Sequence, residues 1–130
     1  MMLEDVRDFI ETLGKSEHTY MGKLDNKSEC SIGVYHSKHE NKFKTAFGGP
    51  SQESYGIKNV TFLVHWNKSP RDTEKASKEL FEALRETREV KTNETTIKFI
   101  QLLTNEPADV GTDENGVYEM VIEAAIIYER

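Results

Sequence analysis

Four carboxylates in the last third of the chain have the residue types that bind metal ions or transfer protons: Asp113, Glu114, Glu119 and Glu123. A helix-loop-helix calcium site needs oxygen ligands at loop positions 1, 3 and 5, glycine at 6 and glutamate at 12. With Gly116 as the glycine, Gly111 falls at position 1 and Ile122 at position 12. The two strongest ligands are therefore missing, and Asn115-Gly116 instead predicts a tight turn.

Two carboxylates in unlike environments can also act as a general acid and base. A hydrolase would use His65 together with Glu119 or Glu123. Nothing in the sequence, however, identifies a nucleophile or carboxylate oriented toward His65. Regularly spaced Glu on an alternating strand is typical of a solvated face, so we predict no catalytic residue and no enzyme activity.

The remaining candidate is a zinc site at Cys30, His36 and His39. Only one cysteine is available and no fourth ligand has a suggestive spacing, so we predict neither a metal site nor a cofactor. The single cysteine also excludes an internal disulfide and is typical of a reducing compartment.

Hydrophobic periodicity predicts the elements that must position these residues. Helical spacing indicates helices over residues 3–13 and 71–87, the second capped by Ser69 with Pro70 at its first position and Asp72 in the capping-box position. Strands are expected at 19–24 and 30–35, joined by a hairpin turn and with Cys30 inside the second. Further strands are expected at 57–66, 96–103 and 118–128, the last alternating about a core face that includes Ile122.

The segment between the second and third strands has neither period. It contains Lys38, Lys42, Lys44 and Phe47 and breaks at Gly48, Gly49 and Pro50. A structureless segment of this length in a small chain is usually functional or disordered. We expect a long mobile loop over residues 37–56 that contacts a partner.

Together these elements predict an α+β fold in one domain, residues 1–130. It would have a single mixed, mostly antiparallel sheet of about five strands with two helices packed on it.

No apolar run approaches the roughly 20 residues of a membrane span, so no membrane partner is expected. Residues 105–130 hold seven acids against Arg130 and carry the whole net charge of −6. That acidity argues against tight nucleic-acid binding there.

The stretches GKLDNKSECSIGVY, SYGIKNVTFLVHW with the helix after it, and EPADVGTDENGVYEMVIEAAIIYER resemble a known family. They are similar to the minor capsid or tail terminator proteins of long-tailed bacteriophages, especially phages of Gram-positive hosts. The resemblance covers Leu3 to Arg130. It implies a structural protein of the virion tail or neck, made in the host bacterial cytoplasm.

The resemblance further implies a ring, typically of six subunits, that caps the tail tube and joins it to the head. Its partners would be other copies of itself, the tail tube protein and the head-tail connector protein, and DNA would pass through the channel without specific binding. No family active site exists to carry over. The candidates for the subunit or partner interface are a basic segment with one aromatic residue and a set of carboxylates near the C-terminus. They are Lys38, Lys42, Lys44 and Phe47, and Asp113, Glu114, Glu119 and Glu123. The alternative is an intracellular peptide- or ligand-binding α+β module that uses the 37–56 loop.

Overall fold

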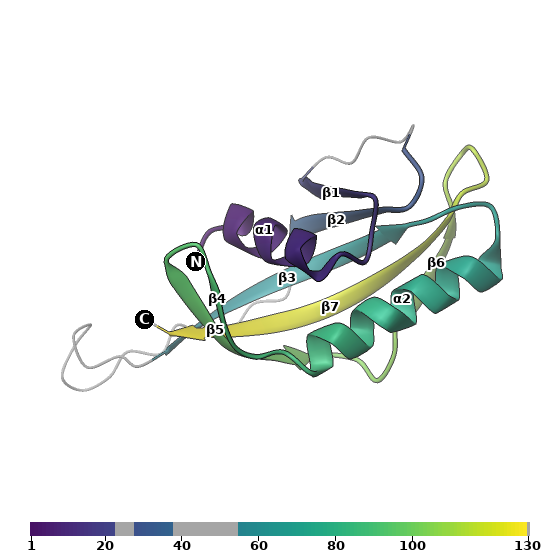
Figure 1. Cartoon of the computed structure of the whole chain (residues 1–130). Helices are drawn as coiled ribbons and strands as arrows, with labels where there is room; N and C mark the ends of the chain where they lie inside the picture. Colours follow the sequence, from purple (N-terminus) through teal and green to yellow (C-terminus); the bar gives the residue numbers. More distant parts are fainter. Residues whose placement is uncertain (23–27, 38–54, 130) are drawn as a thin grey trace.

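The computed structural model describes residues 1–22, 28–37 and 55–129 (Figure 1). Its elements, in chain order, are α1 (Leu3–Leu13), β1 (His18–Met21), β2 (Ser31–His36), β3 (Tyr55–His65), α2 (Pro70–Arg85), β4 (Arg88–Thr92), β5 (Thr95–Leu102), β6 (Ala108–Thr112) and β7 (Tyr118–Glu129). Within the described ranges, no helix is long and apolar enough to cross a membrane.

Strand β7 lies at the centre of the sheet. It pairs with β3 along one edge, and on its other edge with β6 near its start and β5 near its end. The strand order is β1-β2-β3-β7-β5-β4, and every pair is antiparallel except β1 with β2. The predicted α+β class and mixed, mostly antiparallel sheet are confirmed. The predicted number of about five strands is wrong, because the sheet contains seven.

The two strands that the sequence pattern missed are β4 and β6. Strand β4, REVKT, has a single central apolar residue, and every residue of β6, ADVGT, is exposed. Both are held mainly by backbone hydrogen bonds to a neighbouring strand rather than by burial of one face. Apolar alternation reports burial, so it gives no signal for such strands.

Both helices cover the same face of the sheet and form one core with it (Figure 1). Helix α1 buries Val6, Phe9 and Ile10, whereas α2 buries Leu80, Phe81 and Leu84. Beneath them lie alternate residues of β3 and β7, all fully buried: Val60, Phe62, Val64, Ile122, Ala124 and Ile126. These are the core faces that the alternation predicted. A register shift between Ile97 and Phe99 of β5 turns Phe99 to the other face, where it is 41% exposed.

The predicted hairpin between the first two strands is wrong, because β1 and β2 run parallel. Cys30, expected inside the strand, lies just before it in a left-handed conformation with φ of 56°. Its N–H donates to the Trp66 carbonyl at 2.7 Å, and its carbonyl accepts from the Glu17 N–H at 2.9 Å. These two bonds fix the chain so that it enters β2 in the same direction as β1.

Helix α2 begins as predicted, with Pro70 first and the Ser69 hydroxyl accepting from the Asp72 N–H at 3.3 Å. The predicted capping-box bond to Asp72 is replaced, because the Ser69 N–H donates to the side chain of Asn67 instead. The side-chain oxygen of Asn67 accepts from the Ser69 N–H at 2.9 Å, and its amide donates to the Asp72 carboxylate at 3.4 Å. The helix ends at Arg85, two residues before the predicted end, and the Thr87 hydroxyl donates to the Ala83 carbonyl.

Candidate functional site

The most concentrated polar cluster surrounds His65, the last residue of β3. His65 pairs in register with Glu119 of β7, and its Nδ1 lies 3.0 Å from Glu119 Oε2. Its other ring nitrogen, Nε2, lies 3.8 Å from Asp113 Oδ2. The His65 side chain is fully buried, and the side chains of Asp113 and Glu119 are only 13% and 19% exposed. A histidine that the sequence left without a partner is therefore placed between two carboxylates.

Asp113 is held in place by the turn that joins β6 to β7. Its Oδ1 accepts from the N–H groups of Asn115 and Val117, each at 2.9 Å. Gly116 adopts a positive φ of 81°, which glycine tolerates at little cost. A tight turn is present here as predicted, but it is not of type I′: the Gly116 N–H donates to the Asp113 carbonyl at 3.1 Å, so Glu114 and Asn115 are its central residues, and the φ of Asn115 is not positive. Because Oδ1 shapes the turn, Oδ2 is left facing His65. Among the residues that the structure describes, neither Oδ2 nor His65 Nε2 has a hydrogen-bond partner, although both atoms are buried.

Burial limits what this cluster can do chemically. A catalytic histidine must contact its substrate, whereas the His65 side chain is covered and faces protein carboxylates on both ring nitrogens. In the part of the chain that the structure describes, no group of three or more His, Cys, Asp or Glu side chains could hold a metal ion. The arrangement instead joins β3, β7 and the β6–β7 turn through ionisable groups.

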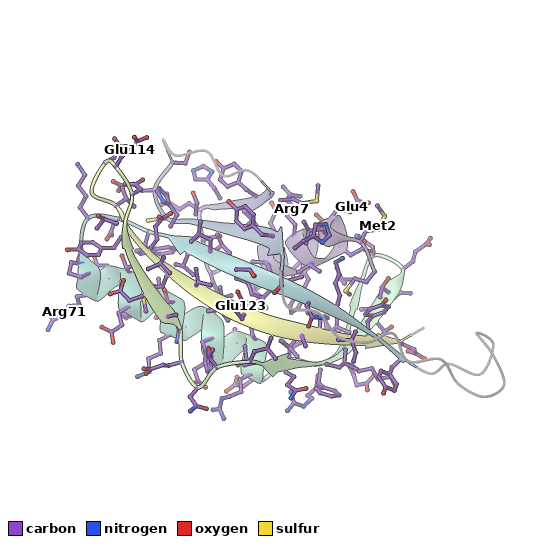
Figure 2. All side chains as sticks on the ribbon, turned by 180° about the vertical axis from the view of Figure 1, so that it is seen from behind. Met2, Glu4, Arg7, Arg71, Glu114 and Glu123 are labelled. Carbon is purple, nitrogen blue, oxygen red and sulfur yellow. The ribbon has the colours of Figure 1, made fainter. Side chains whose placement is uncertain are left out.

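Glu123 does not share this cluster. Its two carboxylate oxygens accept hydrogen bonds from the hydroxyls of Ser37, at 2.9 Å, and Thr61, at 3.0 Å. Figure 2 shows Glu123 on β7, on the side of the sheet turned away from the helices. Of the two carboxylates considered as partners for His65, the structure brings Glu119 to the ring and engages Glu123 with hydroxyl groups.

Of the predicted interface residues, only the four carboxylates lie in the part of the chain that the structure describes. Glu114 is exposed at the tip of the β6–β7 turn (Figure 2), whereas Asp113, Glu119 and Glu123 have partners within the chain. The basic and aromatic candidates Lys38, Lys42, Lys44 and Phe47 lie outside the described residues. So do His39 and most of the 37–56 loop on which the ligand-binding alternative depends.

The thiol of Cys30 has little tendency to act as a ligand or nucleophile. Burial raises its pKa, and the charges of Glu17 and Glu29 raise it further. The thiolate is the form that binds metals and attacks substrates, so this environment disfavours both reactions.

Sequence reasoning missed a groove of about 600 Å³ between α2 and the segment that leads from β5 into β6. Its apolar lining includes Phe81, Pro107 and Met120. Five acidic residues and one lysine also line it: Glu74, Glu82, Glu106, Asp109, Glu119 and Lys78, of which Glu119 directs its carboxylate to His65. These residues come from three separate segments, which the pairing of β6 with β7 and the packing of α2 on the sheet bring together.

Comparison with known proteins gives one family. The family model described as bacteriophage tail terminator protein matches residues 7–130 of this chain. No curated protein and no solved structure gives a significant match.

Proposed function

Because the chain belongs to the bacteriophage tail terminator family, we propose that it forms a ring that caps the tail tube and joins the tail to the head. Membership in this family makes it a structural protein of the phage tail. The observation that carries the proposal is the extent of the match, which spans residues 7–130 and therefore most of α1, all of α2 and the seven strands of the described sheet. The family resemblance found in the sequence is confirmed.

In this proposal the partners are further copies of the chain, the tail tube protein and the head-tail connector protein. The protein acts by binding and assembly rather than by catalysis. It is made in the cytoplasm of the host bacterium and then incorporated into the virion. Residues 1–130 act as one assembly unit, because the C-terminal strand β7 lies inside the sheet and shares a single core with both helices.

A closed ring is built from heterologous contacts, in which one surface of a subunit meets a different surface of its neighbour. The sequence contains two segments of unlike charge. Lys38, Lys42 and Lys44 form a basic segment, and residues 105–130 carry the whole net charge of −6. We therefore propose that the lysine segment of one subunit meets the acidic end of the next, where Glu114 is the exposed carboxylate of the β6–β7 turn.

Acidic surfaces that do not enter subunit contacts would serve a second purpose in a ring. DNA phosphates bind proteins mainly through Lys and Arg, and carboxylates repel them. A channel lined by acidic side chains would let DNA pass without specific binding. The acid-lined groove beside α2 is the alternative location for contact with a basic segment of a neighbouring protein.

The direct test is tube growth in vitro. Purified tail tube protein from the same phage is polymerised with and without this protein, and tube lengths are measured by electron microscopy. We expect shorter tubes with a ring of density at one end. Tubes of unchanged length with bare ends would contradict the capping role. Light scattering on the free protein, run in parallel, reports whether the ring exists before it meets the tube.

A further inference from the structure

We propose that the groove beside α2 binds the stretch Lys42-Phe43-Lys44 of a neighbouring copy of this chain. The aromatic side chain would lie on the apolar floor of the groove, and the two lysines would meet its acidic walls. This inference rests on the proposed assembly into a ring, and it names the surface of one subunit that receives the lysine segment of the next.

The floor of the groove is apolar. Tyr118 and Met120 alternate with the residues of β7 that point away from the helices, so they lie on the helix-covered face. Phe81 of α2 and Pro107 of the β5–β6 connection complete the floor. Met120 and Pro107 are half-buried, and methionine makes favourable contacts with aromatic rings. A groove of about 600 Å³ with this floor is large enough for an aromatic side chain and its neighbours.

The wall formed by α2 carries a row of charged side chains. Glu74, Lys78 and Glu82 follow one another at intervals of four residues, which places them along one face of the helix. Glu82 is already paired with Arg85 at 2.7 Å. Among the described residues, Glu74 has no basic side chain within 4.0 Å. Glu74 is therefore the carboxylate of this wall that is open to a lysine of another subunit.

The opposite wall carries Glu106 and Asp109. Asp109 pairs in register with Met120, and residues paired across two strands place their side chains on the same face, so its carboxylate stands beside the floor. One oxygen of Asp109 accepts from the Gly111 N–H at 2.8 Å, which leaves the other oxygen available. Glu106 is exposed and forms no ion pair within the described ranges. Carboxylates therefore lie on both sides of the apolar floor.

An aromatic residue between two lysines matches this arrangement. In the sequence, Phe43 lies directly between Lys42 and Lys44. Successive side chains of an extended segment point to opposite sides, so an aromatic ring directed at the floor leaves both lysines at the rim. Their long apolar stems let the ammonium groups reach carboxylates on either wall. Charge and apolar contact thus favour the same occupant.

The groove and Glu114 lie at the two ends of β6. Asp109 is near the start of this strand, and Glu114 follows its end in the β6–β7 turn (Figure 2). The five residues from Asp109 to Glu114 span at most about 18 Å, and an extended chain from Lys38 to Lys44 reaches about 20 Å. One lysine segment is therefore long enough to contact both the groove and Glu114.

The test measures the binding of a fluorescein-labelled peptide of residues 36–47, HSKHENKFKTAF, to the full chain by fluorescence anisotropy at low salt. Glu74→Lys with Glu106→Lys reverses one exposed carboxylate on each wall and should weaken binding about tenfold. The matched control is Glu79→Lys with Glu86→Lys, which makes the same change of charge at exposed positions that do not line this groove. The control should bind the peptide with nearly the affinity of wild type.

Variants of the peptide separate the two kinds of contact. Lys42→Glu with Lys44→Glu in the peptide should abolish binding to wild type and restore it on the chain that carries Glu74→Lys and Glu106→Lys, because both sides of the contact are reversed. Phe43→Ala should weaken binding about tenfold at high as well as low salt, because salt does not screen an apolar contact.

A peptide with the photo-crosslinker benzoylphenylalanine at position 43 locates the contact on the wild-type chain, so it decides the matter even where a variant does not fold. We expect crosslinks to Phe81, Pro107 or Met120. Crosslinks confined to other surfaces would overturn the proposal, as would equal peptide affinity for the groove variant and its control. If wild type is already a ring, excess peptide should lower the mass measured by light scattering. None of these measurements involves the tail tube, so the groove contact and the capping role can fail separately.

Discussion

The side chain of Asn93 shows how one residue can join distant parts of this fold. It lies in the turn between β4 and β5 with a positive φ of 53°. Its amide donates to Asp5 at 2.7 Å and to Asp8 at 3.2 Å, both on α1. The bond from Asn93 is the largest cause of the lowered pKa of each carboxyl group, followed by the Met2 N–H for Asp5 and by Arg7 for Asp8.

A pH-dependent stability change should follow from Asn93→Gly, which suits the positive φ and removes the amide. A depressed aspartate pKa contributes stability that is present above the unfolded value, near 3.8, and is lost as the pH falls through the folded value. We expect the variant to melt below wild type at neutral pH, with the gap narrowing in acid. Asn93→Asp should show a wider gap at neutral pH, since it adds a third carboxylate. Curves for wild type and Asn93→Gly that stay equally far apart down to acid pH would exclude this role.

Phe62 tests the face assignment of the central strands. It is fully buried under both helices, so Phe62→Ala should lower the free energy of unfolding by about 3–5 kcal/mol. The matched control is Phe99→Ala, because Phe99 is 41% exposed on the other face and should cost less than about 1 kcal/mol. Urea denaturation measures both. Similar losses in the two variants would refute the assignment.

Individual core residues could be predicted from the sequence, whereas individual polar contacts could not. Alternation alone placed Val60, Phe62 and Ile122 in the core, because a strand with one buried face has a period of two. The contact of His65 with Glu119 depends on the register of β3 against β7, and its approach to Asp113 depends on where the next turn ends. Neither is encoded in local spacing, so the sequence left His65 without a partner.

Among the elements, α1 was predicted with both of its ends, and the start of α2 was predicted because it carries local capping chemistry. Ser69→Ala should remove the bond to the Asp72 N–H and lower the free energy of unfolding by about 0.5–2 kcal/mol. Ser69→Asp should restore most of the loss, because aspartate is an equally good N-cap residue. Urea midpoints for the three proteins decide the matter. Equal midpoints for Ser69→Ala and wild type would mean that Asn67 suffices as the cap.

The wrong predictions among the elements share a physical cause. The β1–β2 segment has turn-forming residues, but backbone bonds from Cys30 to Trp66 and Glu17 set the direction of β2. Strands β4 and β6 exist because β5 and β7 offer free backbone groups, not because their own side chains alternate. Pairing between strands therefore determined the direction of β2 and the positions of β4 and β6, which local sequence patterns did not predict.

For the whole molecule, charge partition gives a test of subunit contact. Lys38→Glu, Lys42→Glu and Lys44→Glu together should weaken self-association at low salt. Exposed pairs contribute only about 0–1 kcal/mol each and are screened as salt rises. Glu114→Lys in the same chain should partly restore assembly, since it reverses both sides of the contact. Light scattering across a salt series measures the mass, and unchanged mass in the triple variant would rule out this pairing.

The family of this chain is shown by similarity along residues 7–130 rather than by the residues of a functional site. Family resemblance of the sequence pointed to a tail terminator, and the family model confirms the family over residues 7–130. The groove beside α2 could not be predicted, because its lining is assembled from α2, the β5–β6 connection and strands β6 and β7. Chain segments that meet only in the folded state leave no common motif in the sequence.

The proposed role in tail completion is tested most directly by deleting the gene from its phage and measuring particles in the lysate by electron microscopy. We expect full heads and tails that fail to join, with tails of abnormal length, and the recovery of normal virions when the wild-type gene is supplied in trans. Rescue of the deletion by a gene that encodes Phe99→Ala would serve as the control for a substitution of an exposed residue. Normal virions with tails of normal length from the deletion would contradict the assignment of this chain as the terminator.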